Sequence, residues 1–519
     1  MGYLSPSLYL LVLAVPVAHV LVAPYTKVEE SFTLHAARDV LHHGFFSQHA
    51  LEQYDHRTFP GAVPRSFIPS VIWATLSLPL LRMGQATGWA NKGLDEQIVL
   101  RIVLAILNGL SVIHVAKALS RRNRSRSTSI FYLVLSLSQF HTMFYAGRPL
   151  PNFTALPLVN LAVSYLMEGL TTRMESPGGR FNRVSRAVTI LALTTSIIRS
   201  ELALFLGALS LYLLITRKIS LLNLVTSGLI GGGGGAVLST VVDSFFWGRW
   251  TWPEFEAIVF NVVEGKSEQW GVSPWYSYLL VHLPKITLFS LPLALYALTT
   301  GAAGRGLGGM MATCIVGLVG GLSCLAHKEW RFIVYAVPLV NSLAATGAAQ
   351  LWDRATKRKS MMDKLGGMIL LGGLVVNVVV TIGLTYVSVH NYPGGEAIEA
   401  LRRVGATSGR SELRVFLPPS VLQTGASRYT FEQDDNSLPR WEFNRIESES
   451  LQTPAQIWSA GFDYTITDEI DRFLQDGRSE WYMVEAIESF GGVSLKPTPG
   501  PVWSPRLWIL SREAVAIDV

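Results

Sequence analysis

Two adjacent carboxylates stand in the first polar stretch of the sequence, directly after an apolar window at residues 5–23. The stretch reads Pro-Tyr-Thr-Lys-Val-Glu-Glu-Ser-Phe and contains Lys27, Glu29 and Glu30. Carboxylates at the mouth of a membrane span are unfavourable unless water, a cation or a substrate meets them. A carboxylate that is partly desolvated beside a lysine can remain ionised and take a proton from a substrate hydroxyl. The alternative is that both glutamates begin an interfacial helix, where acidic side chains favour the helix dipole.

A cationic segment lies between two later apolar windows and reads His-Lys-Glu-Trp-Arg-Phe. Its His327, Lys328 and Arg331 are three groups that can carry positive charge within a few positions at a membrane surface. Arginine clamps a phosphate with two hydrogen bonds and lysine adds a point charge, so the segment predicts a phosphate site. Glu329 is suited to orient Lys328 or Arg331. The alternative is a charged turn between two helices.

Two further arginines lie where membrane segments turn or break. Arg148 belongs to a Gly-Arg-Pro-Leu-Pro-Asn run, a proline-stiffened turn that is expected on the same side as the two motifs above. Arg199 and Glu201 interrupt an apolar window, and ionisable residues inside membrane segments line cavities more often than they face lipid. Arg148, Arg199 and Lys27 are therefore candidate substrate-binding residues. A structural Arg–Glu pair is the simpler explanation of the break.

The elements that position these groups are expected to be membrane spans. Of the 519 residues, 49% are hydrophobic and only 15% are charged, and the mean hydropathy is +0.33. A soluble globular chain carries about 25% charged residues, so the composition argues against a cytosolic enzyme and against disorder. The net charge of +6 fits basic cytosolic loops better than nucleic-acid binding. Cys314 and Cys324 would be about 15 Å apart on one helix, too far for a disulfide.

Apolar windows long enough to cross a bilayer recur over the first three quarters of the chain and predict about 11 or 12 transmembrane helices. They lie near residues 5–23, 66–83, 97–119, 129–146, 151–168, 187–216, 222–246, 277–299, 310–326, 331–350 and 365–390. Window 187–216 is expected to hold two short helices because Arg199 and Glu201 interrupt it.

Arginine and lysine predict the orientation of these spans. Basic clusters that are expected in the cytosol lie at 121–126, 173–186, 217–218 and 354–359. This arrangement makes residues 24–64 the first lumenal loop and 247–276 a second large lumenal loop. The windows 66–83 and 97–119 then cannot both cross the membrane, unless one is re-entrant or the charge rule is violated.

The chain is expected to divide into a membrane domain, 1–390, and a C-terminal lumenal domain, 391–519. In the tail, charges return and short β-type runs appear at 414–417 and 464–466, which predicts a small mixed α/β domain. The glycine run at 231–235 inside a span predicts close helix packing or a locally loosened helix. Tryptophans in the second large loop are expected to anchor at the membrane interface.

These motifs, together with a Phe-Pro-Gly-Ala-Val-Pro-Arg-Ser run at 59–66, resemble those of family 22 glycosyltransferases over about the first 390 residues. That family implies a GT-C fold, in which a polytopic membrane enzyme of the endoplasmic reticulum uses dolichyl-phosphate mannose on its lumenal face. The Lys-Val-Glu-Glu-Ser-Phe form is most similar to the α-1,6-mannosyltransferase branch, which adds the eighth mannose to the lipid-linked N-glycan precursor. The α-1,2 branches usually show an Asp-Glu pair instead.

The resemblance also implies roles for the candidate residues. Glu29 would be the catalytic base and Glu30 its partner. His327, Lys328 and Arg331 would face the donor phosphate or the diphosphate of the dolichyl-diphosphate-linked oligosaccharide acceptor. Glutamate in place of the family's aspartate moves the carboxylate by about 1 Å or more, which leaves the choice between the two glutamates open. The transfer would invert the anomeric configuration. No metal or other cofactor is expected, and the partners are the two lipid-linked substrates and membrane lipid rather than nucleic acid.

Two other functions are compatible with the sequence. One is an α-1,2-mannosyltransferase of the same family, acting in the N-glycan or the GPI-anchor pathway. The other is a polytopic lipid or sugar transporter, since about a dozen spans with internal arginine and glutamate would suit it. A transporter predicts two similar halves with broken helices, which the sequence does not show, and gives no reason for the acidic first loop.

Overall fold

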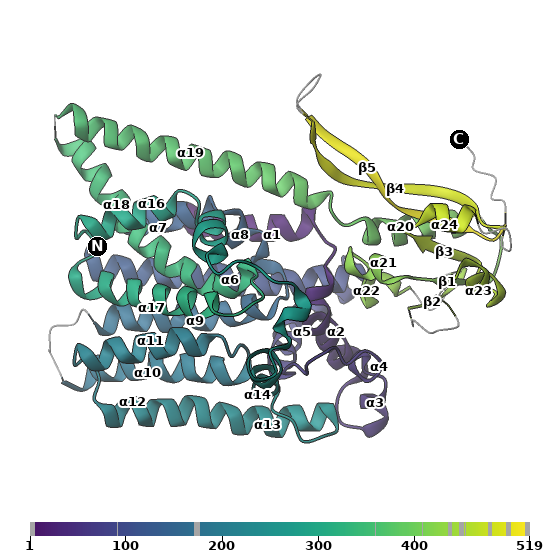
Figure 1. Cartoon of the computed structure of the whole chain (residues 1–519), viewed down its shortest axis with the longest axis horizontal. Helices are drawn as coiled ribbons and strands as arrows, with labels where there is room; N and C mark the ends of the chain where they lie inside the picture. The colour runs from purple at the N-terminus through teal and green to yellow at the C-terminus, as the bar shows by residue number, and fades with distance from the viewer. Residues whose placement is uncertain are drawn as a thin grey trace. The chain divides into compact units, whose positions relative to one another are not determined.

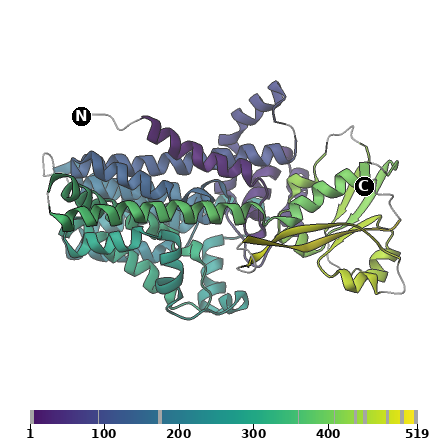
Figure 2. The ribbon, with the colours of Figure 1, turned by 90° about the horizontal axis from the view of Figure 1, so that it is seen from above.

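The structure is a computed structural model of the chain (Figures 1 and 2). It describes every residue except 1–5, 91, 171–176, 359, 407, 434–437, 446–450, 452, 476–479, 495–499 and 514–519, and it gives no side-chain placement for 177–182. Of the basic clusters predicted to face the cytosol, Arg173 and Lys359 lie outside the described residues, and so does the side chain of Arg180.

Helices make up the chain as far as residue 389, and Figure 1 shows the longer ones with nearly parallel axes. The first half contains α1 (Pro6–Val22), α2 (Val28–His43), α3 (Gln48–Glu52), α4 (Asp55–Thr58), α5 (Ile68–Thr87), α6 (Leu94–Asn123), α7 (Arg126–Leu137), α8 (Phe140–Met143), η1 (Tyr145–Gly147), α9 (Pro151–Gly169), α10 (Pro177–Ile197) and α11 (Leu202–Ile215). The break between α10 and α11 falls at Arg199–Glu201, so the prediction of two helices in this window is confirmed.

The remaining helices of this region include three short π-helical stretches, η2, η3 and η5. In order they are α12 (Leu221–Gly228), η2 (Leu229–Gly233), α13 (Gly234–Trp247), α14 (Pro253–Ile258), η3 (Val259–Val263), η4 (Lys266–Trp270), η5 (Tyr278–His282), α15 (Leu283–Thr287), α16 (Ser290–Thr299), α17 (Arg305–Ser323), η6 (Trp330–Ala336), α18 (Val337–Lys357) and α19 (Met361–Val389).

Five helices among the described residues are long and apolar enough to cross a membrane, or up to seven if each of two sharply bent helix pairs forms one span. The bent pairs are 140–147 with 151–169 and 278–287 with 290–299, at 111° and 106°. Helix α6 meets the length and hydropathy of a span, whereas α5 is not among these helices. Two shorter apolar helices, α1 and α11, add to this set. The chain is a multi-pass membrane protein.

Burial separates the central helix from those that face lipid. In η6–α18, 94% of the most apolar window is buried, but only 17% is buried in α12–α13 and in α19. The glycine run brings α13 and η2 against α10: a Cβ atom on Gly231 would lie 2.2 Å from the carbonyl oxygen of Thr189, and one on Gly235 would lie 2.3 Å from Ser196 Oγ. Close packing and a locally loosened helix are both confirmed here, because η2 covers part of the run.

The tail forms a five-stranded mixed sheet flanked by short helices. Its elements are α20 (Pro393–Ala406), β1 (Glu412–Phe416), α21 (Pro419–Gln423), α22 (Arg428–Phe431), β2 (Arg440–Asn444), α23 (Pro454–Ser459), β3 (Tyr464–Thr467), α24 (Ile470–Leu474), β4 (Tyr482–Ser494) and β5 (Gly500–Ser511). The strand order is β2-β1-β3-β5-β4, with β1 parallel to β2 and β3, and β5 antiparallel to β3 and β4. The predicted β-type run 464–466 lies in β3, and the run 414–417 lies in β1 except for its last residue, Leu417.

The chain divides into two compact units. The first comprises Met1–Val20, Ala36–Leu76 and Arg101–Gly383, and the second comprises Leu21–His35, Ser77–Leu100 and Leu384–Val519. The second unit thus contains the tail and, in addition, the opening acidic segment. The boundary falls within five helices, α1, α2, α5, α6 and α19.

Candidate active site

The cationic segment 327–332 follows α17: residues 327–329 have no regular structure, residues 330–332 begin η6, and Glu329 organises the segment. Arg331 donates to Glu329 from Nη2 at 2.7 Å, and its Nε lies 2.6 Å from the other carboxylate oxygen. His327 Nε2 lies 2.9 Å from the same carboxylate. Burial disfavours the charge of Glu329, but Arg331 and His327 outweigh this effect and lower the pKa of the carboxyl. Glu329 therefore orients Arg331, one of the two roles predicted for it.

Lys328 holds the segment against the loop that follows η4. Its Nζ donates to the carbonyl oxygens of Ser273 at 3.1 Å and Leu325 at 2.5 Å, and the residue is buried. The backbone N–H of Ser273 also donates to the carbonyl oxygen of Ala326. An ammonium has three donors, and two of them are used here on carbonyls. In this conformation the lysine fixes the shape of the segment.

The break between α10 and α11 carries a second charged group close to this segment. Arg199 Nε donates to Glu201 at 2.7 Å, and Asn152 Nδ2 donates to the same carboxylate oxygen at 2.9 Å. The guanidinium of Arg199 lies 5.4 Å from the centre of the Phe332 ring, and that of Arg331 lies 5.8 Å from the same ring. The two arginines thus approach one aromatic side chain.

A third arginine, Arg65, joins them from the coil before α5, and the sequence had not marked it as a site residue. Burial, together with the nearby positive charges of Arg199 and Arg331, lowers the pKa of its guanidinium to about 10. We call Arg65, Arg199 and Arg331 the arginine cluster. The backbone carbonyl of Arg65 accepts a hydrogen bond from Trp247 Nε1 at 3.0 Å, which fixes the coil against the end of α13. The sequence feature that could have identified Arg65 is its position in the Phe-Pro-Gly-Ala-Val-Pro-Arg-Ser run at 59–66.

Glu254 is the least expected member of this region, because the sequence predicts only aromatic anchors in the second large loop. The loop enters the site through α14, where Glu254 is buried and accepts a hydrogen bond from the backbone N–H of Ser200 at 2.5 Å. Trp252 Nε1 donates to the carbonyl oxygen of Ser196 at 2.9 Å and fixes the start of α14 at the end of α10. Burial raises the pKa of Glu254 to about 7, although Arg199 acts in the opposite direction.

This raised pKa predicts a pH dependence of stability. A carboxyl with a higher pKa in the folded than in the unfolded chain stabilises the fold fully below its unfolded pKa, near 4.5, and this contribution is lost as the pH rises through about 7. The difference is worth up to about 3 kcal/mol. We therefore expect the Tm of the wild-type protein to fall more between pH 5 and 8 than that of Glu254→Gln, which keeps an acceptor for Ser200. Scanning fluorimetry in detergent measures both curves, and parallel curves would contradict the assignment.

Arg148 lies in a different environment. It is 1% exposed, and its guanidinium lies 4.4 Å from the centre of the Phe144 ring. The preceding turn is held by Arg101, whose Nε donates to the carbonyl oxygen of Gly147 at 3.0 Å. From the same sequence motif it is Asn152 that reaches the charged network around Glu201.

The opening acidic segment is part of the second unit and begins α2. The side chain of Glu30 is buried and accepts a hydrogen bond from the backbone N–H of Lys27 at 3.2 Å, whereas Glu29 is exposed. Lys27 Nζ lies 5.5 Å from the centre of the Tyr392 ring. Both glutamates thus lie in the first turn of a helix, as the alternative interpretation expected, and this is compatible with a chemical role for the exposed carboxylate. That these carboxylates and the arginine cluster share one cavity stays a prediction.

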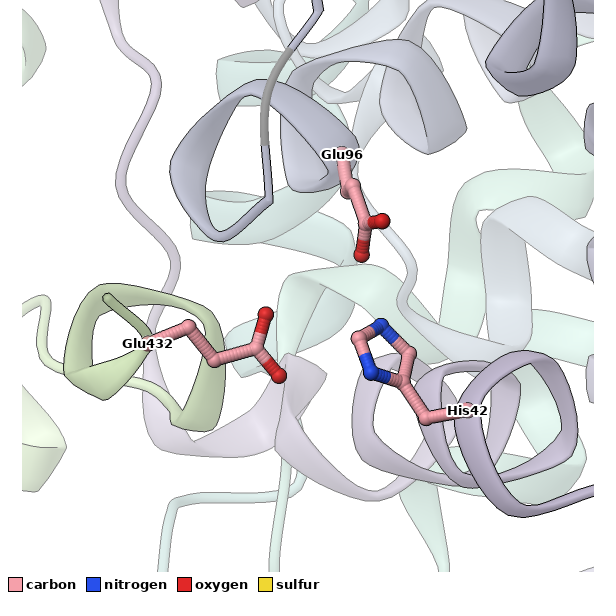
Figure 3. A group of neighbouring side chains, drawn as sticks. All are labelled: His42, Glu96 and Glu432. Atoms are coloured by element: carbon pink, nitrogen blue, oxygen red, sulfur yellow. The ribbon is translucent and has the colours of Figure 1, made fainter. Parts of the chain in front are cut away.

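Two further carboxylates of the second unit lie close together, as Figure 3 shows for Glu96 and Glu432. Their oxygens are within 4.8 Å of each other. Gln85 donates to Glu96 at 3.2 Å, and the backbone N–H of Gly93 donates to Glu432 at 3.1 Å. Carboxylate oxygens are the ligands that hard cations prefer, so this pair would attract a cation. The metal-independent reaction expected from the sequence stays a prediction.

The fold is similar to that of ArnT from Cupriavidus metallidurans bound to undecaprenyl phosphate, with a TM-score of 0.61. The comparison covers 98% of each chain at 12% sequence identity, and at this identity it establishes the fold alone. The predicted class, a GT-C-type helical polytopic membrane protein with a C-terminal mixed sheet, is confirmed.

Residues 7–422 match the Alg9-like mannosyltransferase family, and this chain belongs to that family. It is 30% identical over 516 residues to the Dol-P-Man:Man(7)GlcNAc(2)-PP-Dol alpha-1,6-mannosyltransferase of Saccharomyces cerevisiae, covering 95% of this chain and 90% of the relative. The protein of the same name from Arabidopsis thaliana is 32% identical over 460 residues, covering 88% and 85%. The predicted family and the predicted enzyme class, a mannosyltransferase, are confirmed.

Proposed function

We propose that this chain transfers mannose from dolichyl-phosphate mannose to a dolichyl-diphosphate-linked heptamannosyl oligosaccharide and forms an α-1,6 linkage. The names of the yeast and Arabidopsis relatives give this donor, this acceptor and this linkage, and both relatives are matched over most of their length. The Lys-Val-Glu-Glu-Ser-Phe form of the opening segment agrees with that assignment. The enzyme then works in the endoplasmic reticulum membrane, with its active site facing the lumen.

In this proposal the opening segment supplies the general base. Glu29 is exposed on the first turn of α2, where an acceptor hydroxyl can reach it, and the buried Glu30 holds the turn through the N–H of Lys27. The base takes the proton of the acceptor C6 hydroxyl while that oxygen attacks the anomeric carbon of the donor from the face opposite the phosphate. The C–O bond to the phosphate breaks, and the β-linked donor becomes an α-linked product.

The arginine cluster receives the departing phosphate. Oriented cationic donors stabilise the negative charge that builds on a leaving group, and they are most effective where water is excluded. The observation that best supports this role is the crowding of three guanidinium groups, which helps to lower the pKa of Arg65 and favours an anionic ligand. His327 and Lys328 keep the segment in shape, and Arg148 and Lys27 remain candidate substrate contacts. General-base help is worth about 10²–10⁴-fold, so positioning and phosphate stabilisation must supply most of the acceleration.

The test is a transfer reaction with purified components. Protein in detergent or nanodiscs, synthetic dolichyl-phosphate mannose and a lipid-linked heptamannosyl acceptor should give a product that is one hexose heavier. Linkage analysis should then show the new mannose on a C6 oxygen. An α-1,2 product would support the other branch of the family. Movement of substrate across the bilayer without any product would support a transporter.

A further inference from the structure

We propose that the distal end of the β4–β5 hairpin, residues 489–494 and 500–504, inserts its apolar side chains into the membrane interface beside the end of α19. We call this part the hairpin tip. The proposal concerns the bilayer as a binding partner and is independent of the transfer reaction. Figures 1 and 2 both show the hairpin beside the last turns of α19, all within the second unit.

The depth of the last turns of α19 follows from its length. No charged residue occurs between Lys364 and the end of the helix, and apolar side chains remain exposed along it, among them Val379 at 62% and Ile382 at 64%. Tyr386 is 22 positions after Lys364 in the helix, which corresponds to a rise of about 33 Å. The hydrocarbon core of a bilayer is about 30 Å thick. Tyr386, which is 47% exposed, therefore lies at the boundary between hydrocarbon and headgroups.

The hairpin is attached to α19 at this depth. The ring of His390 lies 4.9 Å from that of Tyr386 and 4.9 Å from that of Trp503, and the Tyr386 and Trp503 rings are 6.4 Å apart. The backbone N–H of Phe490 donates to the carbonyl oxygen of His390 at 3.2 Å. Tryptophan and tyrosine are enriched where membrane and water meet, because their rings are apolar and their polar atoms stay hydrated.

The hairpin tip exposes apolar surface that suits lipid better than water. Val493 is 63% exposed, Val502 is 41% exposed and Trp503 is 36% exposed. Phe490 pairs with Trp503 across the two strands. The sequence from 489 to 504 contains a single charged residue, Lys496. An exposed apolar strand edge promotes aggregation in water unless something covers it. Because the hairpin is attached to Tyr386 and His390 at the end of a helix long enough to cross the membrane, the bilayer is the expected cover.

The experiment measures the depth of one side chain in a bilayer. Cys324, the exposed free cysteine, is first replaced by serine, and Val502→Cys is labelled with a polarity-sensitive fluorophore. The matched control is Met483→Cys, which is 53% exposed at the other end of β4. In phosphatidylcholine nanodiscs we expect blue-shifted emission at position 502 and quenching by lipids with a nitroxide on the headgroup. The quenching should be several-fold stronger than at position 483.

Each outcome decides the proposal. Equal quenching at positions 502 and 483 would place the hairpin tip in water and overturn the proposal. Blue-shifted emission at position 502 without quenching by lipid nitroxides would mean that protein, such as a second copy of the chain, covers the tip, and would also overturn it. If Val502→Cys lowers the Tm, Val493→Cys on the paired strand gives the same readout.

Discussion

Replacing Glu29 by glutamine is expected to lower turnover by about 10²-fold or more, because the amide cannot accept the proton of the acceptor hydroxyl. Glutamine has nearly the same shape, so the Tm and the KM values for both substrates should change little. The loss should therefore appear in kcat, as is typical of an interaction made only in the transition state. Initial rates with synthetic donor and acceptor at saturating concentration measure it.

Glu30→Gln is the matched control for this prediction. A glutamine keeps the side-chain oxygen that accepts the N–H of Lys27, so the first turn of α2 should persist. If Glu30 only positions its neighbour, kcat should fall much less than in Glu29→Gln. A large loss in Glu30→Gln with near-normal turnover in Glu29→Gln would make Glu30 the base. Normal turnover in both variants would show that neither Glu29 nor Glu30 is the general base.

Arg331→Ala is expected to lower kcat/KM for the donor by about 10²-fold, the usual effect of removing one donor from an oxyanion-stabilising group. The guanidinium meets a carboxylate through two nitrogens, which is the geometry that also suits a phosphate. Arg331→Lys keeps the charge but loses this fork, so it should recover only part of the rate. The rates are measured at fixed acceptor over a range of donor concentrations.

Two controls separate loss of phosphate binding from damage to the fold. Arg249 is an exposed arginine on the second large loop that pairs with Glu256, and Arg249→Gln should retain wild-type rates. Arg331→Ala also leaves Glu329 with less positive charge beside it, so a double variant with Glu329→Gln removes the uncompensated carboxylate. If the double variant regains wild-type donor kinetics, the lower kcat/KM of Arg331→Ala came from the uncompensated charge of Glu329. Unchanged donor kinetics in Arg331→Ala would mean that segment 327–332 is only a charged turn and does not bind the donor phosphate.

Much of the fold was predictable because hydropathy and charge act locally. The apolar windows predicted helices, and the break at Arg199 was predictable because ionised groups interrupt an apolar run wherever they fall. The strands β1 and β3 were predictable from short β-type runs. The division of the chain into compact units was not, because the contacts that join residues 21–35 and 77–100 to the tail lie far apart in sequence.

Some contacts of the candidate site were predicted, whereas the roles of its residues in the reaction stay predictions. The segment around Arg331 and the arginine at 199 were identified correctly as neighbours of acidic partners, since Glu329 and Glu201 stand two residues away in each case. The use of Lys328 on two backbone carbonyls could not be foreseen, because it depends on where Ser273 lies. The contacts of Arg65 and Glu254 were missed for the same reason. Their neighbours come from other helices, and the sequence spacing carries no trace of them.

The pairing of Glu329 with Arg331 has one more consequence. This carboxylate occupies the guanidinium that a phosphate would need, so it would compete with the phosphate from within the protein. Dissolved anions such as chloride or sulfate must displace the Glu329 carboxylate from Arg331. Because that carboxylate belongs to the same chain, its effective concentration at the guanidinium is high. A ligand held by a long isoprenoid tail in the adjacent bilayer is concentrated in the same way. If Arg331 binds the donor phosphate as proposed, we expect this arrangement to favour lipid-borne phosphates over dissolved ones without any contact to the lipid itself.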